Sequence, residues 1–144
     1  MTKQEILTHL PYQKPFLFVD EILEVDENSI KGTFTFDKDL YFYKGHFKDY
    51  PVTPGVILTE TMAQIGLACL GAYLMAPSEL VVMMTSSKID FLRPVFPSEK
   101  VTVKSKKNYY RFNKLSCNVV MENEAGEIVC KGEISGMSMV KPHG

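Results

Sequence analysis

The sequence has no tryptophan, only three cysteines and no excess of basic residues. Its 16 Lys and Arg residues against 17 Asp and Glu residues give a formal net charge of -1, so we do not expect the basic surface of a nucleic-acid-binding protein. The three cysteines, Cys69, Cys117 and Cys130, have no metal-ligand spacing and cannot all pair. They favour reduced thiols and a cytoplasmic location, and the first residues lack the apolar run of a signal peptide.

The 144 residues contain no Gly/Ser linker, low-complexity tract or internal repeat. Hydrophobic residues make up 45% of the chain and charged residues 23%, which is the balance of a soluble globular protein. This length is sufficient for one hydrophobic core. We therefore expect a single domain over residues 1–144.

The longest apolar segment runs from Gly55 to Leu74 and contains no basic residue. Glu60 and Gln64 lie near its middle, and a carboxylate in lipid is costly, so we expect a buried helix and not a membrane span. Thr53 suits the N-cap of this helix and Pro54 its first position. The helix should end near residue 75, before Pro77.

Strand-forming patterns flank this helix on both sides. Residues 30–37 alternate strictly, with Ile30, Gly32, Phe34 and Phe36 on one side. The other predicted strands are Phe16–Val25, Leu80–Leu92, Val101–Arg111, Leu115–Glu122 and Glu127–Val140, and a short helix is predicted over Lys3–His9. A helix that is apolar on most faces must be covered. We therefore predict the α+β class, with a curved antiparallel sheet wrapped around one long central helix.

Several groups that could take part in catalysis lie near the start of the long helix in the sequence. His46, in an aromatic-rich loop, is a natural proton acceptor at neutral pH. The amides of Gly55 and Val56 lie where helix N–H groups lack partners, so they can stabilise a developing oxyanion. Glu60 lies within the apolar helix, one turn before Gln64, and burial should raise its pKa and let it act as a general acid.

Each of these features also has a purely structural explanation. His46 could be a packing residue, the Thr-Pro-Gly segment could be no more than a helix cap, and Glu60 could pair with a distant base such as Lys88 or Arg93. Taken one at a time, the structural explanations are preferable. The combined spacing of His46, the Thr-Pro-Gly segment and Glu60 instead favours a catalytic site.

The same spacing resembles a known family. The pattern H-F-x3-P-x2-P-G-x4-E, followed by M-A-Q, looks like the signature of FabZ-type 3-hydroxyacyl-[acyl-carrier-protein] dehydratases, and it is formed here by His46, Phe47, Pro51, Pro54, Gly55 and Glu60. The segments Leu10–Ile22 and Lys88–Val101 also resemble family segments. Lys48, Gln13-Lys14 and Ser98-Glu99 depart from the pattern, which leaves open whether the pathway is housekeeping or specialised.

The resemblance implies a hot-dog fold and a homodimer, or a trimer of such dimers, with active sites at the interface. It implies dehydration of a 3-hydroxyacyl chain on acyl carrier protein, as in fatty-acid biosynthesis, without metal or organic cofactor. His46 of one protomer would act as base and Glu60 of the other as acid, with the Gly55 amide stabilising the thioester oxygen. The substrate-binding residues expected around them are Phe47, Pro54, Val56, Gln64, Phe91 and Arg93.

Three other functions compete with this expectation. A hot-dog thioesterase does not need the loop histidine, so His46 disfavours it. A hydratase acting on coenzyme A thioesters could use a similar pair. A non-catalytic acyl-binding module would keep Glu60 buried without use, at a cost in stability.

Overall fold

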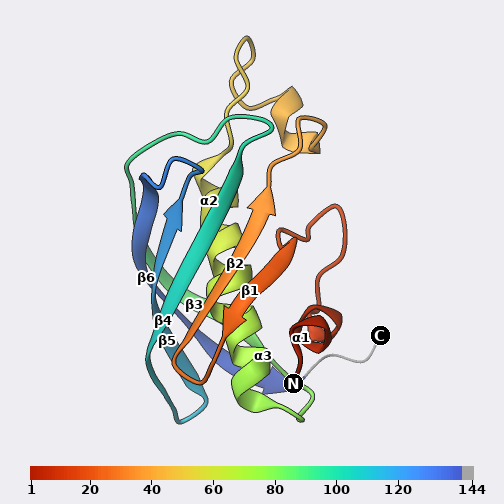
Figure 1. Cartoon of the computed structure of the whole chain (residues 1–144), viewed down its shortest axis with the longest axis vertical. Helices are drawn as coiled ribbons and strands as arrows, with labels where there is room; N and C mark the ends of the chain where they lie inside the picture. Colours follow the sequence, from red (N-terminus) through yellow and green to blue (C-terminus); the bar gives the residue numbers. More distant parts are fainter. Residues whose placement is uncertain (141–144) are drawn as a thin grey trace.

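The computed structural model describes residues 1–140 as a six-stranded antiparallel sheet around one long helix (Figure 1). The helical elements are α1 (Lys3–His9), the 3-10 turn η1 (Tyr41–Lys44), α2 (Gly55–Ala63), the π-helical segment η2 (Gln64–Cys69) and α3 (Leu70–Met75). The strands are β1 (Glu21–Val25), β2 (Ser29–Thr35), β3 (Leu80–Phe91), β4 (Lys100–Arg111), β5 (Lys114–Glu122) and β6 (Ile128–Val140). Their order in the sheet is β1-β2-β4-β5-β6-β3.

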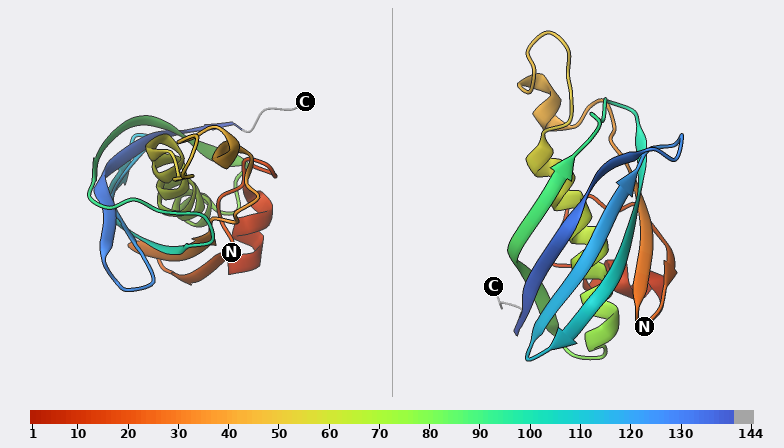
Figure 2. Two further views of the ribbon diagram at one scale, coloured as in Figure 1. Left: turned by 90° about the horizontal axis from the view of Figure 1, so that it is seen from above. Right: turned by 90° about the vertical axis from the view of Figure 1, so that its left-hand side faces the viewer.

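The sheet curls around the continuous rod formed by α2, η2 and α3, as the view from above in Figure 2 shows. This is the predicted hot-dog arrangement, and the prediction of fold class is confirmed. The predicted alternation holds in part, because Ile30, Gly32, Phe34 and Phe36 are all buried, but Thr33 on the opposite side is buried as well. One hydrophobic core therefore lies between the helix and the concave face of the sheet.

The apolar surface of the central helix is covered by the rest of the protein. By length and composition Gly55–Met75 could cross a membrane, with a mean hydropathy of 1.4, but 78% of that window is buried inside the fold. All six residues of η2 are buried. There the Ser105 hydroxyl donates a hydrogen bond of 2.8 Å to the Gly66 carbonyl, so the sheet supplies a polar partner at the irregular turn.

Strands β3 to β6 lie within one residue of their predicted bounds, and two predicted element starts are wrong for reasons that the structure shows. Helix α2 begins at Gly55 with Pro54 as N-cap, one residue later than predicted, because the Thr53 side chain hydrogen-bonds the Tyr43 hydroxyl and does not cap the helix. The strand predicted over Phe16–Val25 forms only from Glu21 onward. The earlier part runs past the helix instead, where the Phe18 amide donates to a side chain of η2.

Strand β3 forms one edge of the sheet. Among the described strands it pairs only with β6, over its full length from Leu80↔Val140 to Phe91↔Cys130. All residues from Met83 to Lys88 are exposed, and Phe91 and Leu92 at its far end are exposed as well. A long, partly apolar edge strand of this kind is a surface on which another strand can pair.

Candidate active site

The loop that carries His46 projects beyond the end of the sheet at the top of Figure 1 and is held by several hydrogen bonds. The Val52 amide donates to the His46 carbonyl (3.3 Å), and the Thr53 amide donates to the Val95 carbonyl (2.8 Å). The His46 ring stacks on Phe47, with centroids 4.7 Å apart and planes 20° apart. The imidazole is therefore part of a fixed structure.

The tautomer of His46 follows from its hydrogen bond. Nδ1 lies 2.8 Å from the Val52 carbonyl oxygen, which can only accept, so Nδ1 carries the proton. Neutral His46 then keeps a lone pair on Nε2. This is the state that a general base requires.

The start of α2 contributes free amides to the same region. The first amides to bond within the helix are those of Ile57 and Leu58, which both donate to Pro54 (2.9 and 3.1 Å). Within residues 1–140, the Gly55 and Val56 amides have no backbone acceptor. They can therefore donate to an oxyanion, as predicted.

His46 and Gly55 line one hollow of about 330 Å³. Phe47, Phe91 and Arg93, three of the residues expected to bind substrate, line it as well. The remaining wall consists of Val52, Thr53, Leu58, Leu92 and Pro94. This hollow therefore combines a base, a helix N-terminus and an apolar wall.

Glu60 lies in a second hollow, where Gln64 fixes it. The Gln64 Nε2 donates to Glu60 Oε2 (2.9 Å) and to the Phe16 carbonyl (3.0 Å), while its Oε1 accepts from the Phe18 amide (2.8 Å). Gln64 itself is fully buried. The supporting polar role predicted for Gln64 agrees with these contacts.

Burial raises the pKa of Glu60, and the hydrogen bond from Gln64 only partly opposes that effect. The alternative that Glu60 pairs with Lys88 or Arg93 is wrong. Arg93 Nε instead lies 3.3 Å from Glu127 Oε2, and Arg93 Nη1 donates to the Ile128 carbonyl. In the described part of the chain, no basic side chain forms an ion pair with Glu60.

The hollow around Glu60 has a volume of about 390 Å³ and mostly apolar walls. Ala63 and Leu67 follow Glu60 on the same helix face. The other lining residues are Pro11, Tyr12, Phe16, Ala68, Val81, Val82, Met83 and Met84. Tyr12 was not singled out in the sequence, although it lies in the Leu10–Ile22 segment that carries the family resemblance.

Within one protomer the two hollows share no residue. The His46 hollow includes Phe91 at the end of β3, and the Glu60 hollow includes Val81 to Met84 at its beginning. One protomer therefore carries two half-sites at opposite ends of its edge strand.

Three of the expected substrate-binding residues line neither hollow in the protomer, and one of them, Gln64, is fully buried behind Glu60. Val56 is 76% exposed, and Pro54 is the N-cap of α2. Both lie directly beside Gly55 in the chain, so they are next to the His46 hollow without forming its wall.

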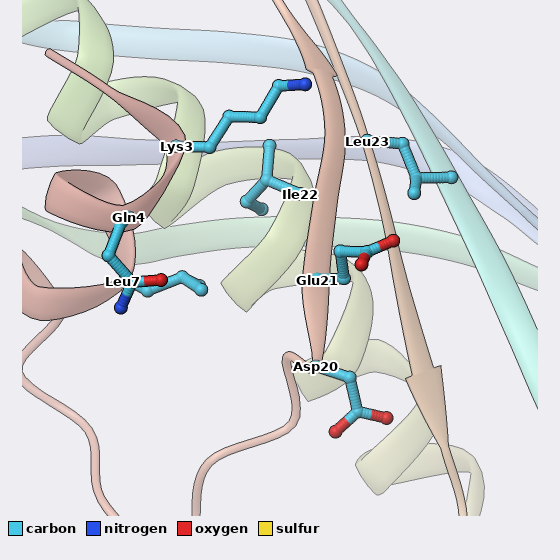
Figure 3. A pocket seen from close by; sticks show the side chains of 7 residues that line it. All are labelled: Lys3, Gln4, Leu7, Asp20, Glu21, Ile22 and Leu23. Atoms are coloured by element: carbon cyan, nitrogen blue, oxygen red, sulfur yellow. The ribbon is translucent and has the colours of Figure 1, made fainter.

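Two other hollows within residues 1–140 contain no histidine, and the larger, of about 600 Å³, is lined in part by Asp20, Asp37 and Asp39. One of about 520 Å³ lies between α1 and β1 and is lined by Lys3, Gln4, Leu7, Asp20, Glu21, Ile22 and Leu23 (Figure 3). Its lining includes no histidine, serine, threonine or cysteine. In the described residues, no group of three or more His, Cys, Asp and Glu could hold a metal ion.

Residues 10–133 match the model of a family described as the FabA-like domain. The chain is 36% identical over 141 residues to the 3-hydroxyacyl-[acyl-carrier-protein] dehydratase FabZ of Sinorhizobium medicae, covering 96% of this chain and 90% of that protein. It is 32% identical over 143 residues to the FabZ of Acinetobacter baylyi, covering 93% and 92%.

Solved structures support the fold. The dehydratase heterocomplex ApeI:P from Xenorhabdus doucetiae is similar, with a TM-score of 0.79 at 14% identity, over 98% of this chain and 93% of that chain. A thioesterase from Haemophilus influenzae has a TM-score of 0.65 at 20% identity, over 86% and 82%. At these identities the likeness concerns the fold alone.

Proposed function

This chain belongs to the FabA-like domain family, and from that premise we propose that it dehydrates 3-hydroxyacyl thioesters carried on acyl carrier protein to 2-enoyl thioesters. The observation that carries the proposal is the pair of half-sites at the two ends of β3. One half-site holds a histidine with a free Nε2, and the other holds a carboxyl group whose pKa is raised. These are the two proton-transfer groups that elimination of water requires.

His46 acts as the base. Its Nε2 takes the proton from C2 of the acyl chain, because Nδ1 is already committed to the Val52 carbonyl. As the C2–H bond breaks, negative charge moves onto the thioester oxygen. The Gly55 amide in the same hollow donates to that oxygen and lowers the barrier.

Glu60 acts as the acid. The pair of electrons left at C2 forms the double bond to C3, and the C3–O bond breaks. The leaving oxygen takes the proton from Glu60 and departs as water. Burial favours the protonated form of Glu60 that can donate, and Gln64 holds the carboxyl group in place.

The two half-sites meet if two copies of β3 pair. In an antiparallel pair around a twofold axis near Ser86, the beginning of one strand lies beside the end of the other. Val81 to Met84 of one protomer then approach Phe91 of its partner, so the Glu60 hollow faces the partner's His46 hollow. The exposed edge of β3 supports such a homodimer, which could assemble further into a trimer of dimers.

The apolar wall around Glu60 suits an acyl chain. Ala63, Leu67 and Met83 offer apolar side chains to it, and the flexible methionine can adapt to the chain. The Phe47 and Phe91 rings extend the apolar surface in the other half-site. We place the reaction in the cytoplasm without a cofactor, where the buried thiols of Cys69, Cys117 and Cys130 would stay reduced.

The experiment is mass spectrometry of a 3-hydroxyacyl chain on acyl carrier protein after incubation with the enzyme. We expect a loss of about 18 Da with the wild-type protein, and a rate about 10²–10⁴-fold lower with His46→Ala, which is the usual range for a lost acid or base. Release of the carrier with a free thiol would indicate a thioesterase and would refute the proposal, as would binding without any change of mass.

A further inference from the structure

The hollow around Glu60 contains a second polar group that the proposed chemistry does not yet use. Of its eleven lining residues, only Glu60 and Tyr12 carry oxygen atoms on their side chains. The other nine lining side chains carry no oxygen, so Tyr12 and Glu60 are the two oxygen-bearing side chains that a ligand in this hollow can meet.

The Tyr12 hydroxyl has no hydrogen-bond partner among residues 1–140. Glu60 is in a similar state, because Oε2 accepts from Gln64 while no described residue donates to Oε1. The charge of Glu60 contributes to raising the pKa of Tyr12, and no hydrogen bond joins the two side chains. Both groups are thus available to a ligand in the same hollow.

Tyr12 is held in place by its surroundings. It follows α1, whose last turn is closed by the Leu10 amide donating to the Leu7 carbonyl, and its ring packs against the core. Burial, and then the charge of Glu60, raises the pKa of Tyr12 to about 12. At neutral pH the hydroxyl is therefore a proton-bearing donor, fixed before any ligand arrives.

We propose that the Tyr12 hydroxyl donates a hydrogen bond to the C3 oxygen of the 3-hydroxyacyl chain and so selects chains that carry an oxygen at this position. This inference rests on the proposed function and extends it. During the reaction Tyr12 keeps its own proton. The C3 oxygen receives its proton from Glu60, leaves as water, and gives up its contact with Tyr12 when it departs.

Binding of two matched ligands tests the role of Tyr12. The probes are 3-hydroxydecanoyl-pantetheine and decanoyl-pantetheine, which differ only in the C3 hydroxyl, and the protein carries His46→Ala so that neither is consumed. Adding Tyr12→Phe removes one hydroxyl and keeps the ring. We expect the preference for the hydroxylated probe, the ratio of the two Kd values, to fall about 10- to 100-fold, the usual effect of one lost hydrogen bond in a dry site.

The matched control is Tyr41→Phe, because Tyr41 lies on η1, is half exposed and lines neither half-site. It should leave the ratio of Kd values unchanged. An unchanged ratio in Tyr12→Phe, including a case in which both probes weaken by the same factor, would overturn the proposal. Absence of dehydration by the wild-type protein would instead refute the proposed function, and the ratio of Kd values would still decide the role of Tyr12.

Discussion

At the scale of single residues, the immediate surroundings of His46 and Glu60 give these two titratable side chains different properties. A carbonyl oxygen beside Nδ1 fixes the tautomer of His46, while an apolar hollow favours the neutral form of Glu60. This difference suits the proposed reaction, in which His46 accepts a proton and Glu60 gives one. The buried amide of Gln64 orients Glu60 without supplying a positive charge that would keep the carboxyl group ionised.

The raised pKa of Glu60 predicts a pH-dependent cost in stability. Because the folded-state pKa lies above the ordinary value of 4.5, the favourable contribution is complete below that value and is lost as pH rises through the folded pKa. Glu60→Gln keeps an acceptor for Gln64 and removes the titration. We expect its free energy of unfolding to rise relative to wild type between pH 4 and pH 8, roughly in step with this titration.

Urea unfolding of both proteins at a fixed concentration and at several pH values measures this difference. Glu124→Gln, in the exposed turn between β5 and β6, is the control and should show no such trend. If the difference in free energy of unfolding between Glu60→Gln and wild type stays constant with pH, the raised pKa of Glu60 is contradicted. The dehydration rate of Glu60→Gln should fall about 10²–10⁴-fold.

The residues that the sequence identified are those whose chemistry is visible in their side chains. His46 and Glu60 stand out because their types and spacing are unusual near an apolar helix. The Val52 carbonyl that selects the tautomer has no signature, since any residue supplies a carbonyl. Tyr12 was missed for a different reason, because its exposure to the hollow depends on how the segment after α1 crosses the helix.

At the scale of elements, strand β3 depends on glycines in β6. A Cβ atom on Gly132 would overlap the Lys88 carbonyl oxygen, and one on Gly136 would lie 2.6 Å from the Met83 carbonyl oxygen. These glycines let the edge strand lie close against its neighbour. Since β3 borders both half-sites, its attachment to β6 matters for function as well as for stability.

Gly132→Ala should therefore destabilise the protein by about 1–3 kcal/mol or more, because the backbone of β3 must move away. Denaturant unfolding measures the loss. Gly45→Ala is the matched control, since a Cβ atom on Gly45 meets nothing within 4 Å and its φ is -122°. Equal stability of the two variants would show that β3 adjusts without cost.

Element boundaries followed from the sequence where local chemistry decides them. The helix Lys3–His9 and the end of α3 at Met75 are as predicted, since Pro11 and Pro77 stop both helices. The start of α2 was wrong because the hydroxyl of Thr53 is used in a distant contact. The π-helical turn of η2 could not be foreseen, as its partner Ser105 lies on another element.

At the scale of the whole molecule, the site depends on the strand order. The sequence predicts β3 as a strand, but only the order β1-β2-β4-β5-β6-β3 makes it an edge. That position leaves its beginning beside Glu60 and its end beside His46 within one protomer. In the proposed homodimer, antiparallel pairing of two such edges would bring each Glu60 to the partner's His46, and the strand order that allows this is not visible in any local pattern of the chain.

Mixing two inactive variants tests this arrangement. In a dimer formed from one His46→Ala protomer and one Glu60→Gln protomer, one composite site carries both substitutions and the other carries neither. Random exchange of protomers should therefore restore about one quarter of wild-type turnover, since half of the dimers are mixed and each has one intact site.

The measurement is dehydration rate against mixing ratio, after the two variants are co-expressed or refolded together. The mixture should be most active near equal amounts and inactive at either extreme. A wild-type level is not expected at any ratio, because every mixed dimer keeps one damaged site. If base and acid instead came from the same protomer, every site would lack one group, and the mixture would be as inactive as its components. Recovery thus depends on β3 pairing antiparallel with its copy, and its absence in a mixture that contains mixed dimers would exclude the composite site.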